Sequence, residues 1–146
     1  MVKHYLVHIG LFVKALRLYT FPAPVAAVLI AAAVADATGA AVPPLYIVLL
    51  LVGVCSLFFG ANLVNDYYDF RRGVDTPQSL GTSGVLVQGL LSPAAVRRGY
   101  RLLYAIACLA AAYFIAQRGL PLVLLLAAGI AGGYLYTGGP WPLKYH

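Results

Sequence analysis

Long apolar runs alternate with short polar segments along most of the chain. Each run approaches or reaches the roughly 20 apolar residues that a helix needs to cross a bilayer. We therefore predict an all-α, polytopic membrane helix bundle with about four transmembrane helices. The predicted spans cover about residues 18–35, 45–64, 102–116 and 120–136.

The segments between the runs predict how the helices are connected. Residues 1–17 mix apolar and basic side chains, as an amphipathic helix at the membrane surface does. Residues 36–44 contain Gly and Pro and predict a turn between the first two spans, and residues 117–119 predict a tight turn before the last. Ser92-Pro93 favours a helix start, because Ser is a good N-cap and Pro is tolerated in the first turn.

A long connection, residues 70–98, separates the second and third spans. Connections of this length without their own secondary structure are uncommon and are usually functional or disordered. This one has several glycines and an apolar patch at residues 85–87. We expect a partly helical cap over the end of the second span, within a single membrane domain of residues 1–146.

Composition supports a membrane protein and gives an orientation. The chain is 62% hydrophobic and 10% charged, against about 25% charged residues in soluble domains, and its mean hydropathy is +0.87. The net charge of +6 does not indicate nucleic-acid binding, because the basic residues are sparse and lie between apolar spans. With four spans, nine basic residues lie on one side and Arg118 alone on the other, so both termini and the long connection are predicted to be cytoplasmic, in the cell inner membrane. The nine are Lys3, Lys14, Arg17, Arg71, Arg72, Arg97, Arg98, Arg101 and Lys144.

Acidic residues are concentrated at the end of the second span. The chain has four, all Asp, and three of them lie within residues 62–75. On a continuous helix, Asn62, Asn65, Asp66 and Asp69 would share an arc of roughly 100°, since they are three or four residues apart. Such groups are costly near lipid and usually face a bundle interior or a wet cavity, where they are functional.

Carboxylates with amide partners suit a hard divalent cation. Mg²⁺ is commonly held by one or two carboxylates and carries substrate phosphates as well. The plainer alternative is a helix end capped by short polar residues and solvated in a loop, because Asn and Asp favour such positions.

Two separated stretches resemble one family of membrane enzymes. Residues 65–69, Asn-Asp-Tyr-Tyr-Asp, followed by Gly-Val-Asp at 73–75, resemble the first aspartate-rich motif of the UbiA-type intramembrane prenyltransferases. Residues 136–145, Tyr-Thr-Gly-Gly-Pro-Trp-Pro-Leu-Lys-Tyr, are similar to the stretch after the fourth span of the same enzymes. Within the superfamily the likeness is greatest to the 1,4-dihydroxy-2-naphthoate polyprenyltransferases of menaquinone synthesis.

This resemblance implies transfer of a polyprenyl group from an allylic polyprenyl diphosphate, bound through Mg²⁺, to an aromatic acceptor. It implies catalytic and metal-binding roles for Asp66 and Asp69, with Asn65 as a further metal ligand. Gly84 stands where many relatives show Arg, so Arg71 or Arg72 would have to contact the diphosphate instead; topology and lipid-headgroup contact are their alternative roles. The expected substrate-binding residues are Asn62, Asn65, Arg71, Arg72 and Asp75.

The resemblance covers only the amino-terminal half of the family's fold. No acidic residue follows Asp75, whereas full members carry a second aspartate-rich motif. We therefore expect a fragment of a larger domain, inactive alone or completed by a second chain that supplies the carboxy-terminal half. A noncatalytic membrane protein that binds isoprenoid diphosphate or assists assembly is the first alternative, and a transporter or channel module is the second.

Overall fold

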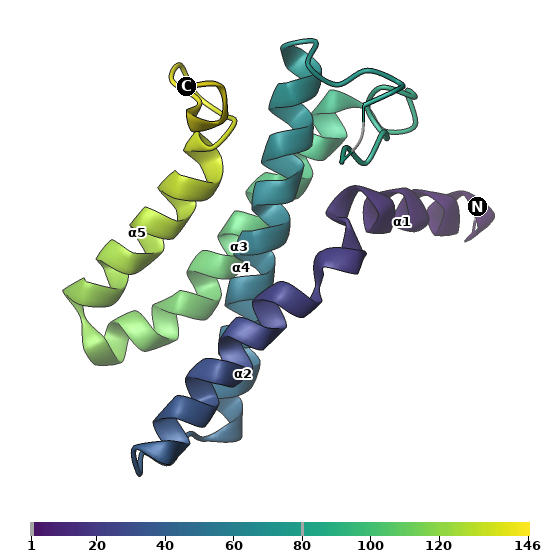
Figure 1. Ribbon diagram of the computed structural model, residues 1–146. Coiled ribbons are helices and arrows are strands. Elements are labelled where there is room, and N and C mark those ends of the chain that lie inside the picture. Colours follow the sequence, from purple (N-terminus) through teal and green to yellow (C-terminus); the bar gives the residue numbers. More distant parts are fainter. Residues whose placement is uncertain (1, 80) are drawn as a thin grey trace.

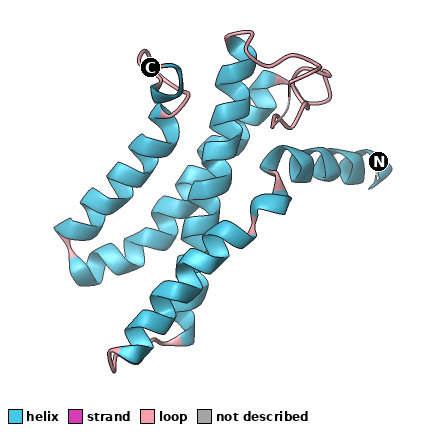
Figure 2. Ribbon diagram, in the orientation of Figure 1, coloured by secondary structure: helices cyan, strands magenta, loops and turns pink. Residues whose placement is uncertain are grey.

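The computed structural model describes residues 2–79 and 81–146, with side chains from Ile9 onward. Five helices follow one another along the chain, with a short 3-10 turn before α2 and another near the carboxyl end (Figure 1; Figure 2). Helix α1 projects sideways from the other four, which run together as a bundle. The bounds are α1 Val2–Leu16, η1 Leu18–Thr20, α2 Pro22–Ala37, α3 Pro44–Arg71, α4 Pro93–Arg118, α5 Leu120–Leu135 and η2 Leu143–Tyr145.

Proline and a serine cap define where several helices begin. Pro22, Pro44 and Pro93 each occupy the first turn of a helix, where the missing amide proton costs no intrahelical bond. The Ser92 hydroxyl accepts a hydrogen bond from the Ala95 amide at 3.2 Å and so caps α4. Helix α3 continues to Arg71, beyond the predicted end of its span, and carries the Asn and Asp side chains on a continuous helix.

The bundle is built around α3 and α4, which form its most extensive helix pair. Small residues let them approach closely: a Cβ at Gly53 would lie 3.3 Å from the Ala110 Cβ. Helices α2 and α5 pack against α3 as well, and the carboxyl end of α1 contacts α3 at Asn62. Close approach through small residues is typical of membrane helix packing.

The buried core lies at one end of the bundle, where α1, α3, α4 and the long loop meet. Ala15, Leu63, Val85 and Val96 bring one side chain from each of these elements into it. Apolar side chains elsewhere on the helices are widely exposed, such as Leu109 at 74%. An exposed apolar surface on long helices fits contact with lipid.

These observations confirm an all-α membrane bundle. Among the described residues, three helical segments are long and apolar enough to cross a bilayer, namely Leu18–Ala37, Pro44–Arg71 and Pro93–Arg118, and α5 is a shorter apolar helix. Within the predicted connection of residues 70–98, α3 continues to Arg71 and α4 begins at Pro93, and the described residues between them form turns, bends and irregular segments. Gly73, Gly81, Gly84 and Gly89 have positive φ there, a conformation that interrupts a right-handed helix.

Candidate functional site

Asp66 is buried near the carboxyl end of α3, with only 1% of the residue exposed. Its carboxylate forms an ion pair with the Arg17 guanidinium from the α1–α2 junction. The Ser83 hydroxyl, from the long loop, donates a hydrogen bond to its other oxygen. Charge pairing with additional hydrogen bonds is what a carboxylate needs to remain buried.

Asp69 lies one turn further along α3, with 2% of the residue exposed. Its partners come from the other end of the chain: the Lys144 Nζ lies 2.6 Å from Oδ2, and the Tyr145 hydroxyl donates to Oδ1. Burial, this hydrogen bond and the Asp69 charge raise the pKa of the Tyr145 phenol above its usual value. The phenol therefore stays protonated, and remains a donor, across the physiological pH range.

The two asparagines extend the same polar network along α3. Asn65 accepts a hydrogen bond from Arg17 at 3.3 Å and donates one to Asp69 at 2.7 Å, so it links Asp69 to the Arg17–Asp66 pair. Asn62 donates to the Leu16 carbonyl at 3.2 Å and so fixes the end of α1. The structure thus places all four predicted side chains on one face of α3; their chemical roles stay predictions.

Arg17 has the most unusual backbone among the described residues. Its φ of 56° is the only positive value at a residue other than glycine in that part of the chain. Left-handed backbone is unfavourable for a residue with a Cβ, and strained positions of this kind tend to occur at functional sites. Sequence reasoning assigned Arg17 to topology alone, and its backbone and ion pair now place it in the polar network.

The remaining predicted site residues lie around this network. Arg71 is exposed and donates to the Tyr67 hydroxyl at 3.2 Å. Arg72 donates to the Thr137 carbonyl and, at 2.8 Å, to the Gly139 carbonyl, so it holds the carboxyl-terminal segment.

Asp75 belongs to the loop beyond α3. Its carboxylate accepts a hydrogen bond from Thr82 at 2.7 Å. Asp75 thereby supports the loop turn that carries Ser83.

A cavity of about 320 Å³ adjoins the Arg17–Asp66 pair. Basic and hydroxyl side chains from α1, η1 and the loop line much of it. These are the groups that bind phosphate oxygens. The lining residues are Val13, Lys14, Arg17, Leu18, Tyr19, Thr82 and Ser83.

The donor set on this face of α3 fits a hard divalent cation that brings further oxygen ligands with it. Asp66, Asp69 and Asn65 offer carboxylate and amide oxygens, the type that Mg²⁺ prefers. In the described part of the chain, no cluster of three or more His, Cys, Asp or Glu side chains forms a complete protein site. A cation here would therefore share its coordination with substrate and water, and would compete with Arg17 and Lys144 for the carboxylates.

Comparison with known proteins identifies the same family that the sequence motifs resemble. Residues 24–146 match the UbiA prenyltransferase family. The 1,4-dihydroxy-2-naphthoate octaprenyltransferase of Bacillus subtilis is 43% identical over 84 residues, which are 58% of this chain and 27% of that protein. UbiA prenyltransferase domain-containing protein 1 is 37% identical in Xenopus tropicalis and 35% in Homo sapiens, each over 131 residues, or 88% of this chain and 37% and 38% of those proteins.

The chain thus spans between a quarter and two fifths of the length of these relatives. No solved structure matches it. The family match covers most of the sequence, including both aspartates and the segment that carries Lys144. The chain belongs to the UbiA prenyltransferase family.

Proposed function

We propose that the enzyme containing this chain transfers a polyprenyl group from an allylic polyprenyl diphosphate to an aromatic acceptor. Family membership supports prenyl transfer, and the B. subtilis relative supports an acceptor such as 1,4-dihydroxy-2-naphthoate, in menaquinone-type synthesis. The observation that carries the proposal is the pair of buried carboxylates, Asp66 and Asp69, the first of which contacts Arg17 and Ser83 in the wall of a basic cavity.

Different residues of the polar network and the cavity would bind Mg²⁺ and the phosphate oxygens of the diphosphate. Asp66, Asp69 and Asn65 would hold Mg²⁺, which when bound stabilises negative charge developing on the diphosphate. Arg17 and Lys14 line the cavity and would bind phosphate oxygens directly.

Residues around the network would keep it in place. Asn62 orients the end of α1, and Asp75 holds the loop through Thr82. Arg71 is the freer of the two predicted arginines for contact with diphosphate, because Arg72 already binds two backbone carbonyls.

The chain spans between a quarter and two fifths of the relatives' length, so the proposal concerns the protein as a whole. In each relative the matched segment is part of a longer single chain. The comparisons therefore do not support a separate second chain. Within the protein as a whole, this segment supplies one side of the diphosphate site.

Location in the membrane follows from the apolar helices, and the charge distribution suggests the orientation. We propose that the enzyme lies in the cell inner membrane with the carboxyl end of α3, which carries the aspartates, towards the cytoplasm. Basic residues gather at that end of the bundle, as the positive-inside rule requires. Water-soluble acceptors would reach the site from this side.

Substitution of the two aspartates tests the proposal. In purified protein, we expect Asp66→Asn and Asp69→Asn each to weaken Mg²⁺-dependent binding of farnesyl diphosphate at least about tenfold, since each removes a charged ligand. Asp36→Asn is the matched control, because Asp36 is exposed at the far end of α2. Calorimetric titration with and without Mg²⁺ measures both effects.

Transfer to dihydroxynaphthoate is then measured in the full-length enzyme with the same variants. Loss of transfer in both aspartate variants, with Asp36→Asn unaffected, is the expected result. Mg²⁺-dependent binding without any transfer would favour a noncatalytic isoprenoid diphosphate binder. Binding that is independent of both Mg²⁺ and the aspartates would remove the role proposed for them.

A further inference from the structure

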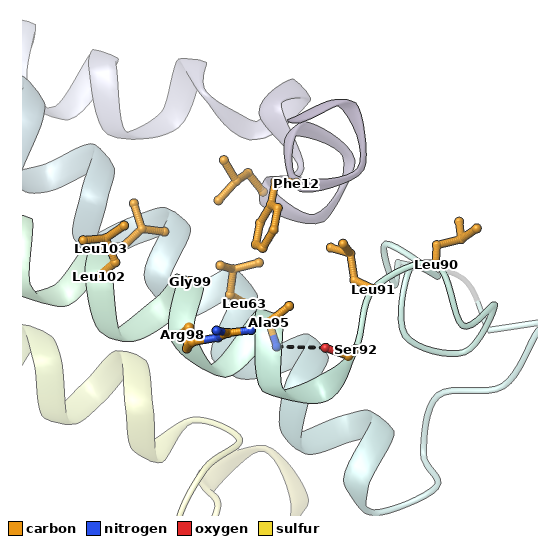
Figure 3. Close-up of a pocket in the computed structure, with 11 residues that line it drawn as sticks. Phe12, Leu63, Leu90, Leu91, Ser92, Ala95, Arg98, Gly99, Leu102 and Leu103 are labelled. Carbon is orange, nitrogen blue, oxygen red and sulfur yellow. Dashed lines mark hydrogen bonds between the residues drawn. The ribbon is translucent and has the colours of Figure 1, made fainter. Parts of the chain in front are cut away.

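A second hollow is lined by residues of α1, α3, the long loop and α4. It measures about 700 Å³, within the range of about 300–1,000 Å³ typical of ligand clefts. Figure 3 shows Phe12 of α1 facing Leu63 of α3, with Leu91 of the loop beyond them and Leu102 and Leu103 further along α4. None of the carboxylates or asparagines of the polar network lines it.

The wall of this hollow is apolar except at one place. Among its lining residues, only Ser92 and Arg98 have polar side chains. The Ser92 hydroxyl already accepts the hydrogen bond that caps α4. Arg98 is therefore the charged group that the hollow offers to a ligand, and its side chain is exposed.

The position of the hollow connects it to the bilayer. Leu102, on its rim, is 63% exposed, and it belongs to one of the helices long enough to span a membrane. Arg98 lies one helical turn before Leu102 on α4, and the nearby Arg97 and Arg101 are also exposed. A basic side chain beside an apolar groove at a membrane surface is a common setting for anionic lipid headgroups.

The charges also discriminate between ligands. A metal-bound diphosphate requires carboxylate ligands, and no acidic residue lines this groove. One guanidinium matches the single negative charge of a phosphodiester. A ligand with one phosphodiester and a long hydrocarbon chain fits both the charge and the apolar wall.

We propose that this groove binds an anionic phospholipid of the surrounding bilayer. Its phosphodiester lies at Arg98, and one acyl chain lies between Phe12 and Leu102. The lipid then fills the space between α1 and α4 and holds α1 against the bundle. This site is separate from the proposed transfer reaction and does not depend on it.

Lipid retention tests the proposal directly. The purified protein is placed in nanodiscs of equal phosphatidylglycerol and phosphatidylcholine, extracted in mild detergent and analysed by native mass spectrometry. We expect preferential retention of one phosphatidylglycerol. Arg98→Gln should lower this preference about fivefold, as expected for one basic side chain near an anionic surface, and Arg98→Lys should keep it.

Arg97→Gln is the matched control, because it removes the same charge one position away and Arg97 does not line the groove. Unchanged retention in this variant supports a defined site. Equal loss in Arg97→Gln and Arg98→Gln, or equal retention of the two lipids by the unmodified protein, would overturn the proposal. Retention of farnesyl diphosphate that depends on Arg98 but not on Mg²⁺ would also overturn it, in favour of a substrate subsite.

Discussion

Arg17 joins a strained backbone to a buried charge. Its left-handed φ turns the chain between α1 and α2, and its guanidinium reaches Asp66 and Asn65 on α3. Its Nε is also buried without a hydrogen-bond partner in the part of the chain that the structure describes. The left-handed backbone and the burial of the guanidinium both cost free energy, and the ion pair with Asp66 offsets these two costs.

Replacing either partner of this pair should destabilise the protein strongly. We expect Arg17→Asn to cost about 3–5 kcal/mol, because it leaves the Asp66 charge buried and uncompensated, while Asn tolerates left-handed backbone. The free energy of unfolding, measured by denaturant titration in mixed micelles, gives this cost.

The double variant Arg17→Asn, Asp66→Asn provides the control. We expect it to cost clearly less than the sum of the two single variants, since neither charge then lacks its partner. Simple addition of the two costs would mean that the side chains do not interact.

At the residue scale, the sequence predicted the near neighbours in the site and missed the distant ones. Spacing along one helix was enough to group Asn65 with Asp66 and Asp69. Arg17 and Lys144 lie 49 and 75 positions from their carboxylates, so their approach depends on how whole helices pack. The positive φ of Arg17 could not be predicted either, because this backbone conformation is expected at Gly or Asn and not at Arg.

Among the elements, α3 is the central helix of the fold, because α1, α2, α4 and α5 all pack against it. Its glycines set how closely they do so. A Cβ at Gly60 would lie 2.5 Å from the Tyr104 ring of α4, whereas one at Gly132 of α5 would meet no atom within 4 Å. A Cβ at position 60 would therefore force the Tyr104 ring to shift.

Gly60→Ala should lower the free energy of unfolding by about 1–3 kcal/mol, because the added methyl group overpacks the α3–α4 contact. Gly132→Ala is the matched control and should be neutral or stabilising by up to about 1 kcal/mol, since alanine favours a helix over glycine. Thermal unfolding of both variants in detergent measures the difference. Equal midpoints would show that Tyr104 moves aside without cost.

Arg72 connects α3 to the segment after α5. It donates to the Thr137 and Gly139 carbonyls, and this segment carries Lys144, whose amide bonds the Tyr136 carbonyl at 2.8 Å. Arg72 thus supports one half of the site from outside it.

Arg72→Met should raise the hydrogen-exchange rate of the Lys144 amide about tenfold, because a hydrogen bond from a charged donor contributes about 1.5 kcal/mol. Arg71→Met, which removes the neighbouring charge but leaves both carbonyl contacts, should leave that rate unchanged. The exchange is followed by mass spectrometry of peptides from residues 136–146. Similar rates in the two variants would refute the role of Arg72.

Helix positions could be predicted well because apolar runs, prolines and the Ser92 cap mark them locally. The long loop could not. Between Arg71 and Pro93 its glycines adopt positive φ, and its hydrogen bond to Asp66 and its place in the buried core form only in the folded bundle.

Across the whole molecule, polar chemistry gathers at one end of the bundle. The loop after α3 lies at the end opposite the turn between α2 and α3 (Figure 1). If the positive-inside rule applies, the two ends face different compartments. Single cysteines introduced at each end of the bundle would report which compartment each end faces.

We expect Thr38→Cys to react with a membrane-impermeant maleimide from outside intact spheroplasts, and Gln78→Cys to react only after permeabilisation. Both positions are exposed, and the native Cys55 and Cys108 are first replaced by Ala. The reverse pattern would invert the proposed orientation.

The ion pair between Asp69 and Lys144 has a consequence for the order in which the protein is made. Lys144 follows Asp69 by 75 positions, so at roughly 5–20 residues per second it emerges about 4–15 s later. Asp66 meets Arg17 as soon as α3 has been synthesised, whereas Asp69 must wait for α4 and α5. The insertion machinery therefore handles α3 with one of its two carboxylates still unmatched, until the segment after α5 emerges.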